Sequence, residues 1–239
     1  MRQSSAEFSQ LLVKAGRGVG LPLGLAEDLV DPGIWLQTCG FPGDVEVLGA
    51  LTALDQEQVE RRFPDLRAAT DFSSARMISG VYLAATACDL LQLGWPAIGE
   101  EVFLPKTESP LLVAAALALS NRGLRRESFL SIETSEHVFF SAPTGEIVCV
   151  QKEPQHQSPD PNSDGVIRLL VQQSGPDGVG TVLVDSEKES RFYGVRRLKG
   201  LCASPDSIAQ LKVFADRLLV PESEHSLKFG AGAGIVDSD

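Results

Sequence analysis

The residue types best suited to binding or catalysis are concentrated in two glycine-rich segments, one near each end of the chain. The first, GRGVGLPLGLAED at 16–28, places Arg17 among glycines that permit unusual backbone angles and a close approach to another group. A guanidinium offers a fork of donors that suits a carboxylate or a phosphate. A helix predicted to begin near residues 22–24 would add free N–H groups at its positive end. We therefore expect Arg17, Gly18 and Gly20 to bind a small anionic substrate.

The acidic residues at the end of this segment allow two interpretations, a catalytic role and a simpler structural role. Glu27 would act as an acid or base toward an anion that Arg17 orients. Glu27 and Asp28 also fall in the first turn of the predicted helix, where carboxylates oppose its dipole favourably. In that case the glycines form a tight corner between two helices, and Arg17 lies on the surface. The sequence leaves both interpretations open.

The second segment, VPESEHSLKFGAGAGIVDSD at 220–239, combines a polar cluster with a glycine-rich tail. Its catalytic candidates are Glu224 and His225, because an imidazole beside carboxylates can act as a base or bind a metal. The substrate-binding candidates, which would let the backbone pass close to a ligand, are Ser223, Gly230, Gly232 and Gly234. The candidate oxygen ligands for a divalent metal are Asp237 and Asp239.

A purely structural role for the tail is the alternative. The tail would then pack as an extended closing strand after a loop that starts at Pro221, with His225 hydrogen-bonded and solvated. On the binding interpretation, the two segments meet in one pocket from opposite ends of the chain. A separation of more than about 15 Å would exclude that pocket, because a base must reach its proton directly or through one water.

These two segments resemble a bacterial family of uncharacterised proteins, a domain of unknown function. The shared motifs are R-G-x-G-L-x-x-G-L-A-E-D at 17–28 and V-P-x-S-E-x-S-x-x-x-G-A-G-A-G-x-x-D-x-D at 220–239. Where family members often carry Trp and Arg, this chain has Leu23 and Lys228, and a lysine grips an anion less well than a two-pronged arginine. The resemblance implies a bacterial, cytoplasmic protein and supplies no reaction.

Composition and charge narrow the classes of function. The 239 residues carry a formal net charge of −11, which repels phosphate backbones, so we expect no nucleic-acid partner. No apolar run is long enough for a membrane span, and the first residues lack the apolar core of a secretory signal. The four cysteines are widely separated and suit a reducing cytosol. We therefore expect a cytoplasmic protein that needs no membrane.

Several cofactor and catalytic motifs are missing from the sequence. It contains neither the phosphate-binding G-x-x-x-x-G-K-[ST] nor the hydrolase G-x-S-x-G. The G-x-G-x-x-x-G pattern within 17–24 follows a predicted helix instead of a strand, which argues against a dinucleotide fingerprint. The three histidines show no H-x-x-x-H spacing. A divalent metal with ligands gathered from afar is the cofactor that stays possible.

Most of residues 1–125 are predicted to be helical. Ser4 and Glu7 match a capping box ahead of apolar residues at helical spacing. The stretch at 73–94 is apolar on nearly all sides and predicts a buried helix. The Ala/Leu-rich stretch at 109–123 starts with Ser-Pro and stops with Asn-x-Gly, which is typical of a helix. The remaining predicted helices are 24–36, with a break or kink at 31–33, and 45–54, with an extension to 62.

Strand signals dominate after residue 126. Residues 128–151 predict a hairpin split by Ser-Ala-Pro-Thr-Gly, and turn formers fill 151–165. A final helix is predicted from Ser204 to about Leu218, before the extended tail. Grouped strands favour an α+β fold with a mainly antiparallel sheet, in one domain over 1–239. The remaining predicted strands are 166–173, 180–185 and 193–198.

Two classes of function are compatible with these patterns. The first is a small-molecule enzyme or ligand-binding protein, with a pocket built from 16–28 and 222–239 that takes a small anionic metabolite. The second is a non-catalytic accessory subunit, in which the helices at 73–93 and 109–122 form the face of a homo-oligomer, most simply a symmetric dimer. We favour the first, and a large exposed apolar patch would favour the second.

Overall fold

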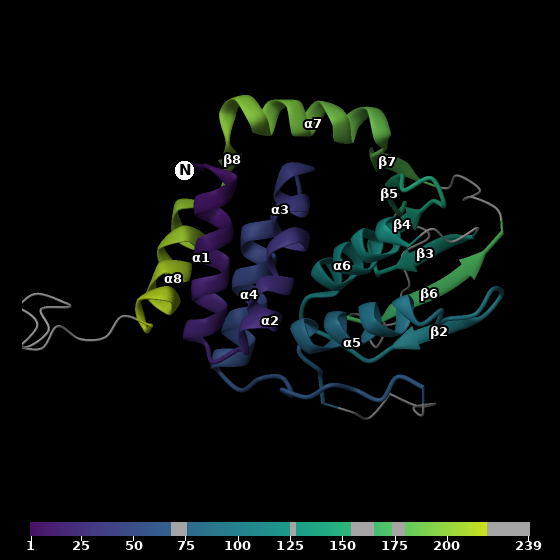
Figure 1. The fold of residues 1–239 in the computed structure, drawn as a ribbon, viewed down its shortest axis with the longest axis horizontal. Helices are drawn as coiled ribbons and strands as arrows, with labels where there is room; N and C mark the ends of the chain where they lie inside the picture. Colours follow the sequence, from purple (N-terminus) through teal and green to yellow (C-terminus); the bar gives the residue numbers. More distant parts are fainter. Residues whose placement is uncertain (68–75, 125–127, 154–164, 174–179, 219–239) are drawn as a thin grey trace, which may run out of the picture.

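The computed structural model describes residues 1–67, 76–124, 128–153, 165–173 and 180–218. Within them the chain has the expected α+β architecture, with helices in the first half, an antiparallel sheet in the second half and a helix after it (Figure 1). The glycine-rich tail and most of the predicted loop at 151–165 lie outside the described residues.

A layer of helices lies on the side of the molecule away from the sheet (Figure 1). The capping box predicted for the first of them is present, since Ser4 Oγ accepts from the Glu7 amide and the Glu7 carboxylate accepts from the Ser4 amide. The apolar spacing of this helix buries Phe8 and Leu12. The layer comprises α1 (Ser5–Gly18), α2 (Leu23–Asp28), α3 (Val30–Thr38), α4 (Gly43–Asp55) and α8 (Pro205–Asp216).

The sheet has six described strands, all antiparallel, in the order β2-β6-β3-β4-β5-β7. The predicted turn after Ser141 joins β4 to β5, as expected from its Pro-Thr-Gly sequence. On one face, α5 (Gly80–Gln92) and α6 (Pro110–Gly123) lie between the sheet and the helical layer (Figure 1). The strands are β2 (Glu101–Leu104), β3 (Phe129–Glu133), β4 (His137–Ser141), β5 (Ile147–Gln151), β6 (Ile167–Gln172) and β7 (Thr181–Val184).

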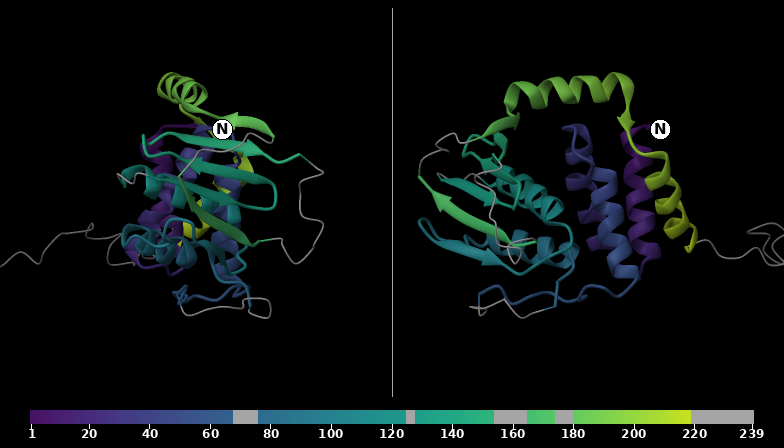
Figure 2. Two further views of the ribbon diagram at one scale, coloured as in Figure 1. Left: turned by 90° about the vertical axis from the view of Figure 1, so that its right-hand side faces the viewer. Right: turned by 180° about the vertical axis from the view of Figure 1, so that it is seen from behind.

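The helix α7 (Ser186–Lys199) crosses from the sheet to the helical layer along one edge of the molecule (Figure 2). It leads into β8 (Leu201–Cys202), which pairs antiparallel with β1 (Arg2–Gln3). None of its residues is buried. Arg196 ties it to α3, since its Nη1 donates to Thr38 Oγ1 at 3.0 Å.

The prediction of a strand at 193–198 is wrong, because this stretch lies within α7. Asp185 caps the helix by accepting from the Lys188 amide at 2.8 Å. Carboxylates occupy the first turn and basic residues the last, which matches the helix dipole. The β-branched and aromatic residues of 192–195 are typical of a strand, whereas the capping residue and the charges in the first and last turns favour a helix.

Other boundaries also differ from those predicted. The helix expected at 24–36 is broken, as predicted, but the break lies at Leu29 instead of 31–33, and Pro32 stands in the first turn of α3, where a missing N–H is tolerated. The helix predicted at 45–54 is present as α4, which ends at Asp55 without the extension to 62. The helix at 73–94 begins only at Gly80. The strand β2 in the first half was not predicted.

One polar cluster joins α7 to both layers. The carboxylate of Glu189 accepts from Trp35 Nε1 of α3 at 2.7 Å and from Arg122 Nη2 of α6 at 2.8 and 2.9 Å. Trp35 is only 1% exposed, and its ring packs against Phe41 and against Phe139 of the sheet. The cluster therefore adds hydrogen bonds to an aromatic contact between the helical layer and the sheet.

We expect Glu189→Gln to lower the free energy of unfolding by about 2 kcal/mol, because Arg122 would lose a charge-assisted partner in a partly buried place. Chemical denaturation monitored by circular dichroism measures the change. Glu187→Gln, on the same helix but fully exposed, is the matched control and should change stability by less than about 0.5 kcal/mol. Equal effects of the two substitutions would contradict the role given to Glu189.

Candidate functional site

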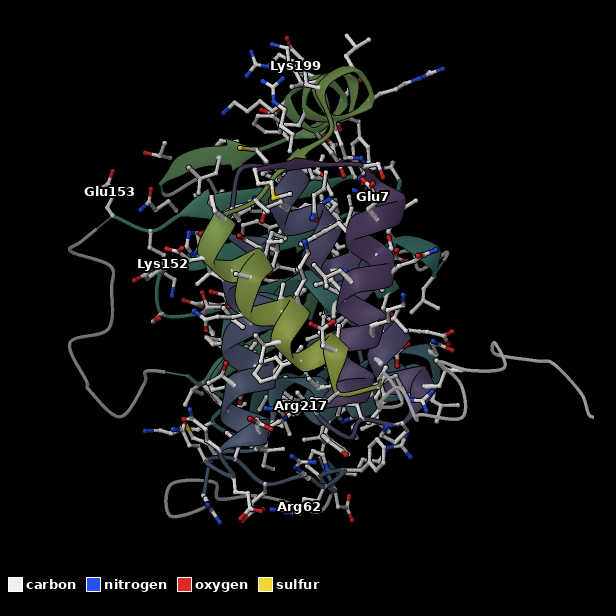
Figure 3. The ribbon with its side chains drawn as sticks, turned by 90° about the vertical axis from the view of Figure 1, so that its left-hand side faces the viewer. Glu7, Arg62, Lys152, Glu153, Lys199 and Arg217 are labelled. Carbon is white, nitrogen blue, oxygen red and sulfur yellow. The ribbon has the colours of Figure 1, made fainter. Side chains whose placement is uncertain are left out.

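Two glycines of the N-terminal segment, Gly18 and Gly20, have structural explanations. A Cβ added to Gly18 would stand 1.8 Å from the Phe214 carbonyl oxygen, so α1 can approach α8 this closely only with glycine there. Figure 3 shows the two helices side by side, with Arg217 at the end of α8. Gly20 has a φ of +91°, a conformation that favours glycine. Arg17 is exposed at the end of α1. This arrangement matches the tight helix–helix corner that the sequence left open.

The C-terminal candidates lie outside the described residues. They are Ser223, Glu224, His225, Gly230, Gly232, Gly234, Asp237 and Asp239. The meeting of 16–28 with 222–239 therefore stays a prediction, as do the catalytic and metal-binding roles given to the tail. Of the candidates in the first segment, only Glu27 lines a cavity that the structure describes.

That cavity, which we call the acidic cavity, has a volume of about 740 Å³ and lies between α2, α3, α5 and α6. Its size falls in the range of small-molecule sites. Its lining residues are Pro22, Gly24, Leu25, Glu27, Asp28, Asp31, Pro32, Phe63, Ala84, Ala85, Cys88, Asp89, Gln92, Ala116, Leu119 and Ser120. Four of these side chains are carboxylates, and none is a lysine or an arginine.

The four carboxylates, Glu27, Asp28, Asp31 and Asp89, are exposed and form the rim of the acidic cavity. Among the described residues, none of them has a basic side chain within ion-pair distance. The pKa of Asp28 is raised, first by partial burial and then by the charges of Asp89 and Glu27. The rim thus carries uncompensated negative charge.

The floor of the acidic cavity is apolar and built from small side chains. Ala84 and Ala85 of α5 face it together with Ala116 and Leu119 of α6. Short alanine side chains leave the depth that larger residues would fill. At the mouth stands Phe63, 61% exposed, with its ring edge-on to Tyr82 at 5.1 Å between centroids. An exposed aromatic face at this position can receive a cation.

The thiol of Cys88, at the floor of the acidic cavity, is held in its protonated form. Burial raises the pKa of Cys88 to about 12, so it stays protonated near neutral pH. Ser120 of α6 is its hydrogen-bond partner. The acidic cavity therefore offers charge and apolar surface without an activated thiolate, which suits binding better than covalent chemistry.

A second cavity, of about 380 Å³, lies between the α3–α4 connection and the sheet. Burial, with the charges of Glu108 and Glu136, raises the pKa of Glu46 to about 7. Burial also lowers the pKa of His137, whose ring meets the edge of Phe41 at 5.6 Å between centroids. A carboxyl whose pKa lies near neutrality and an imidazole in the same cavity are candidate acid–base groups.

Sequence reasoning identified only part of this arrangement. It singled out Glu27 and Asp28 as the end of a motif, but expected an anion beside them. The sequence could have indicated Asp89 as a candidate site residue, because it is the single charged residue in the apolar helix α5. Nothing in the sequence indicates Phe63 or Glu46 in this way, since their positions in the cavities depend on contacts between segments far apart in the chain.

Among the described residues, no group of three or more His, Cys, Asp or Glu side chains is arranged to hold a metal ion. None of the described helices combines the length and apolar character needed to cross a membrane.

Comparisons with known proteins add no relative. No protein-family model, curated protein or solved structure matches this chain. The resemblance to an uncharacterised bacterial family accordingly stays an expectation. A function for this chain can therefore be proposed only from its own cavities.

Proposed function

We propose that this chain is a binding protein for a small organic cation, an aliphatic di- or polyamine, held in the acidic cavity. The observation that carries the proposal is the rim of four carboxylates around a cavity of about 740 Å³ with no basic lining residue. A positively charged ligand would supply the compensation that the described lining residues lack.

The shape of the acidic cavity supports an elongated amine over a bare ion. Its volume far exceeds that of a single cation, whereas an aliphatic stem would cover the apolar floor around Ala84 and Leu119. Amino groups at the ends of the stem would meet rim carboxylates from α2 and α5. The face of Phe63 would add a cation–π contact at the mouth.

This proposal keeps the ligand-binding class that the sequence favoured and changes the sign of the ligand's charge. Arg17 is not among the lining residues of the acidic cavity. An anionic metabolite at Arg17 and the tail remains the competing proposal, and it enters the experiment as a separate arm.

Isothermal titration calorimetry at low salt tests the proposal with an aliphatic diamine and a triamine. We expect dissociation constants of about 10 μM to 1 mM, and no heat from a diol of equal length or from a dicarboxylate. Binding of the dicarboxylate without binding of the amines would contradict the acidic cavity and favour the Arg17 proposal.

Asp28→Asn should weaken amine binding about five- to tenfold, because it removes one rim charge. The same substitution should raise the melting temperature of the free protein by about 1–2 °C, since it relieves repulsion from Asp89 and Glu27. Asp216→Asn, an equal change of net charge at an exposed position at the end of α8, is the control and should leave affinity unchanged. Equal losses in both variants would mean that the amine senses only overall charge.

The affinity should also depend on pH. The pKa of Asp28 is raised by its surroundings, and an amine binds the ionised carboxylate. Affinity should therefore fall as the pH is lowered through the raised pKa of Asp28, and calorimetry across that range in wild type and Asp28→Asn separates this group from the other rim carboxylates. A pH profile that is the same in both proteins would exclude Asp28 from the site.

A second candidate function is acid–base catalysis in the second cavity, and Glu46 is the observation that favours it. A carboxyl with a pKa of about 7 can both give and take a proton near neutral pH. The neighbouring Glu136 and His137 would share in that transfer.

The free energy of unfolding depends on the protonation state of Glu46. Its pKa is raised from 4.5 to about 7 on folding, so the folded state holds this proton more tightly than the unfolded chain. Its contribution to the free energy of unfolding is therefore present at low pH and is lost as the pH rises from 4.5 through about 7. In Glu46→Gln this part of the pH dependence should disappear, whereas the exposed control Glu187→Gln should keep it. Denaturant unfolding at a series of pH values measures this pH dependence. Identical profiles of the free energy of unfolding against pH for Glu46→Gln and wild type would contradict the raised pKa.

A further inference from the structure

The sheet has a second face that no described helix covers. Figure 2 (left) looks onto this outer face, and the described helices α1 to α6 and α8 lie behind the strands. The pairing register places alternate residues of each strand on it. Its apolar residues are Phe103, Phe129, Val138, Phe140, Val148, Val150, Leu170 and Val182.

The apolar part of the outer face is unusual for a surface that meets only water. Phe140 and Leu170 are half-buried by their neighbours within the sheet, and they do not pack against the core between sheet and helices. Phe103 is 53% exposed and Val182 is 39% exposed. An antiparallel sheet with a solvated face normally shows polar residues there, so this composition indicates a partner surface.

Four charged residues on the same face form a continuous row of alternating sign. Glu101 of β2 accepts from Arg168 of β6 at 2.5 Å, and Arg168 donates to Glu133 of β3 at 2.8 Å. Lys152, just after β5, is 2.6 Å from Glu133. The order across the sheet is thus acid, base, acid, base. The row sums to zero in a chain whose net charge is −11.

An alternating row with an even number of charges is complementary to its own reverse. A two-fold axis parallel to the strands, between two sheets packed face to face, would reverse the row of the second copy. Glu101 would then face Lys152 of the second copy, and Arg168 would face Glu133 of the second copy. Every pair has opposite signs, whereas a row with one sign would repel its copy.

From this self-complementary row on an apolar sheet face, we infer that the outer face of the sheet binds a second copy of this chain, forming a symmetric dimer of two face-to-face sheets. Aligned packing of this kind is common between antiparallel sheets. The charge row fixes the register of the two copies, and the apolar residues supply the buried area. Symmetric pairing of identical patches is also the most frequent mode of association.

The interface sits elsewhere than the sequence suggested. The Ala/Leu-rich stretches at 73–93 and 109–122 were the expected oligomer face. In the structure most apolar residues of α6 are buried between the sheet and the helical layer, so they are not free to contact a second copy.

The test is the mass in solution, by sedimentation equilibrium at about 100 μM protein, where a dimer of moderate affinity is populated. Wild type should have twice the chain mass of 25.6 kDa. Arg168→Glu and Glu133→Arg should each weaken the dimer about tenfold to hundredfold, because each brings two pairs of like charges together. An equimolar mixture of the two variants should restore a dimer, since all four facing pairs are then opposite in sign.

The control variant is Arg217→Glu, which reverses an arginine of similar exposure in the ion pair with Asp55 on the far side of the molecule. It should leave the dimer intact. A monomeric wild type, a dimer that survives both Arg168→Glu and Glu133→Arg, or a mixture that stays monomeric would each overturn the inference. If circular dichroism shows that a charge variant is unfolded, Phe103→Ser replaces it, with Leu198→Ser on α7 as its control. The dimer should weaken only with Phe103→Ser, and an unchanged dimer would again overturn the inference.

Discussion

The carboxylate of Glu189 on α7 makes hydrogen bonds to α3 and to α6, and so links three parts of the molecule. It accepts from Trp35 in the helical layer and from Arg122 on the helix that covers the sheet. Buried polar groups of this kind fix one arrangement, because any shift leaves a donor or a charge unsatisfied. Apolar packing alone, as between Trp35 and Phe139, tolerates small displacements. The cluster therefore fixes how α7 sits against α3 and α6, the two helices that also border the acidic cavity.

The charge of the acidic cavity has a cost that the fold does not repay. Partial burial raises the pKa of Asp28, and the neighbouring charges of Asp89 and Glu27 raise it further, which means that these carboxylates repel one another in the free protein. Proteins commonly keep such unfavourable arrangements where they bind a ligand. Under the proposed function, an amine with an aliphatic stem would contact the rim carboxylates and the apolar floor at once.

The sequence was most informative where local physics decides the structure. The capping box at Ser4, the Ser-Pro start of α6 and the turn after Ser141 are all present, because each depends on a few neighbouring residues. The fold class followed from the grouping of strands. The glycine at position 18 is explained by the carbonyl of Phe214, nearly the whole chain away, which no local pattern indicates. The cavity was missed for the same reason, since its rim and floor come from four helices whose meeting no local pattern encodes.

Binding of a cation at the rim carboxylates should be visible directly at Asp28. Carboxyl-carbon NMR can follow the titration of Asp28 in the free protein and again with saturating diamine. We expect a pKa above the ordinary value of 3.8 in the free protein and a clear decrease when the amine binds, because the cation favours the ionised form. An ordinary pKa in the free protein, or a raised pKa that the amine does not change, would contradict it.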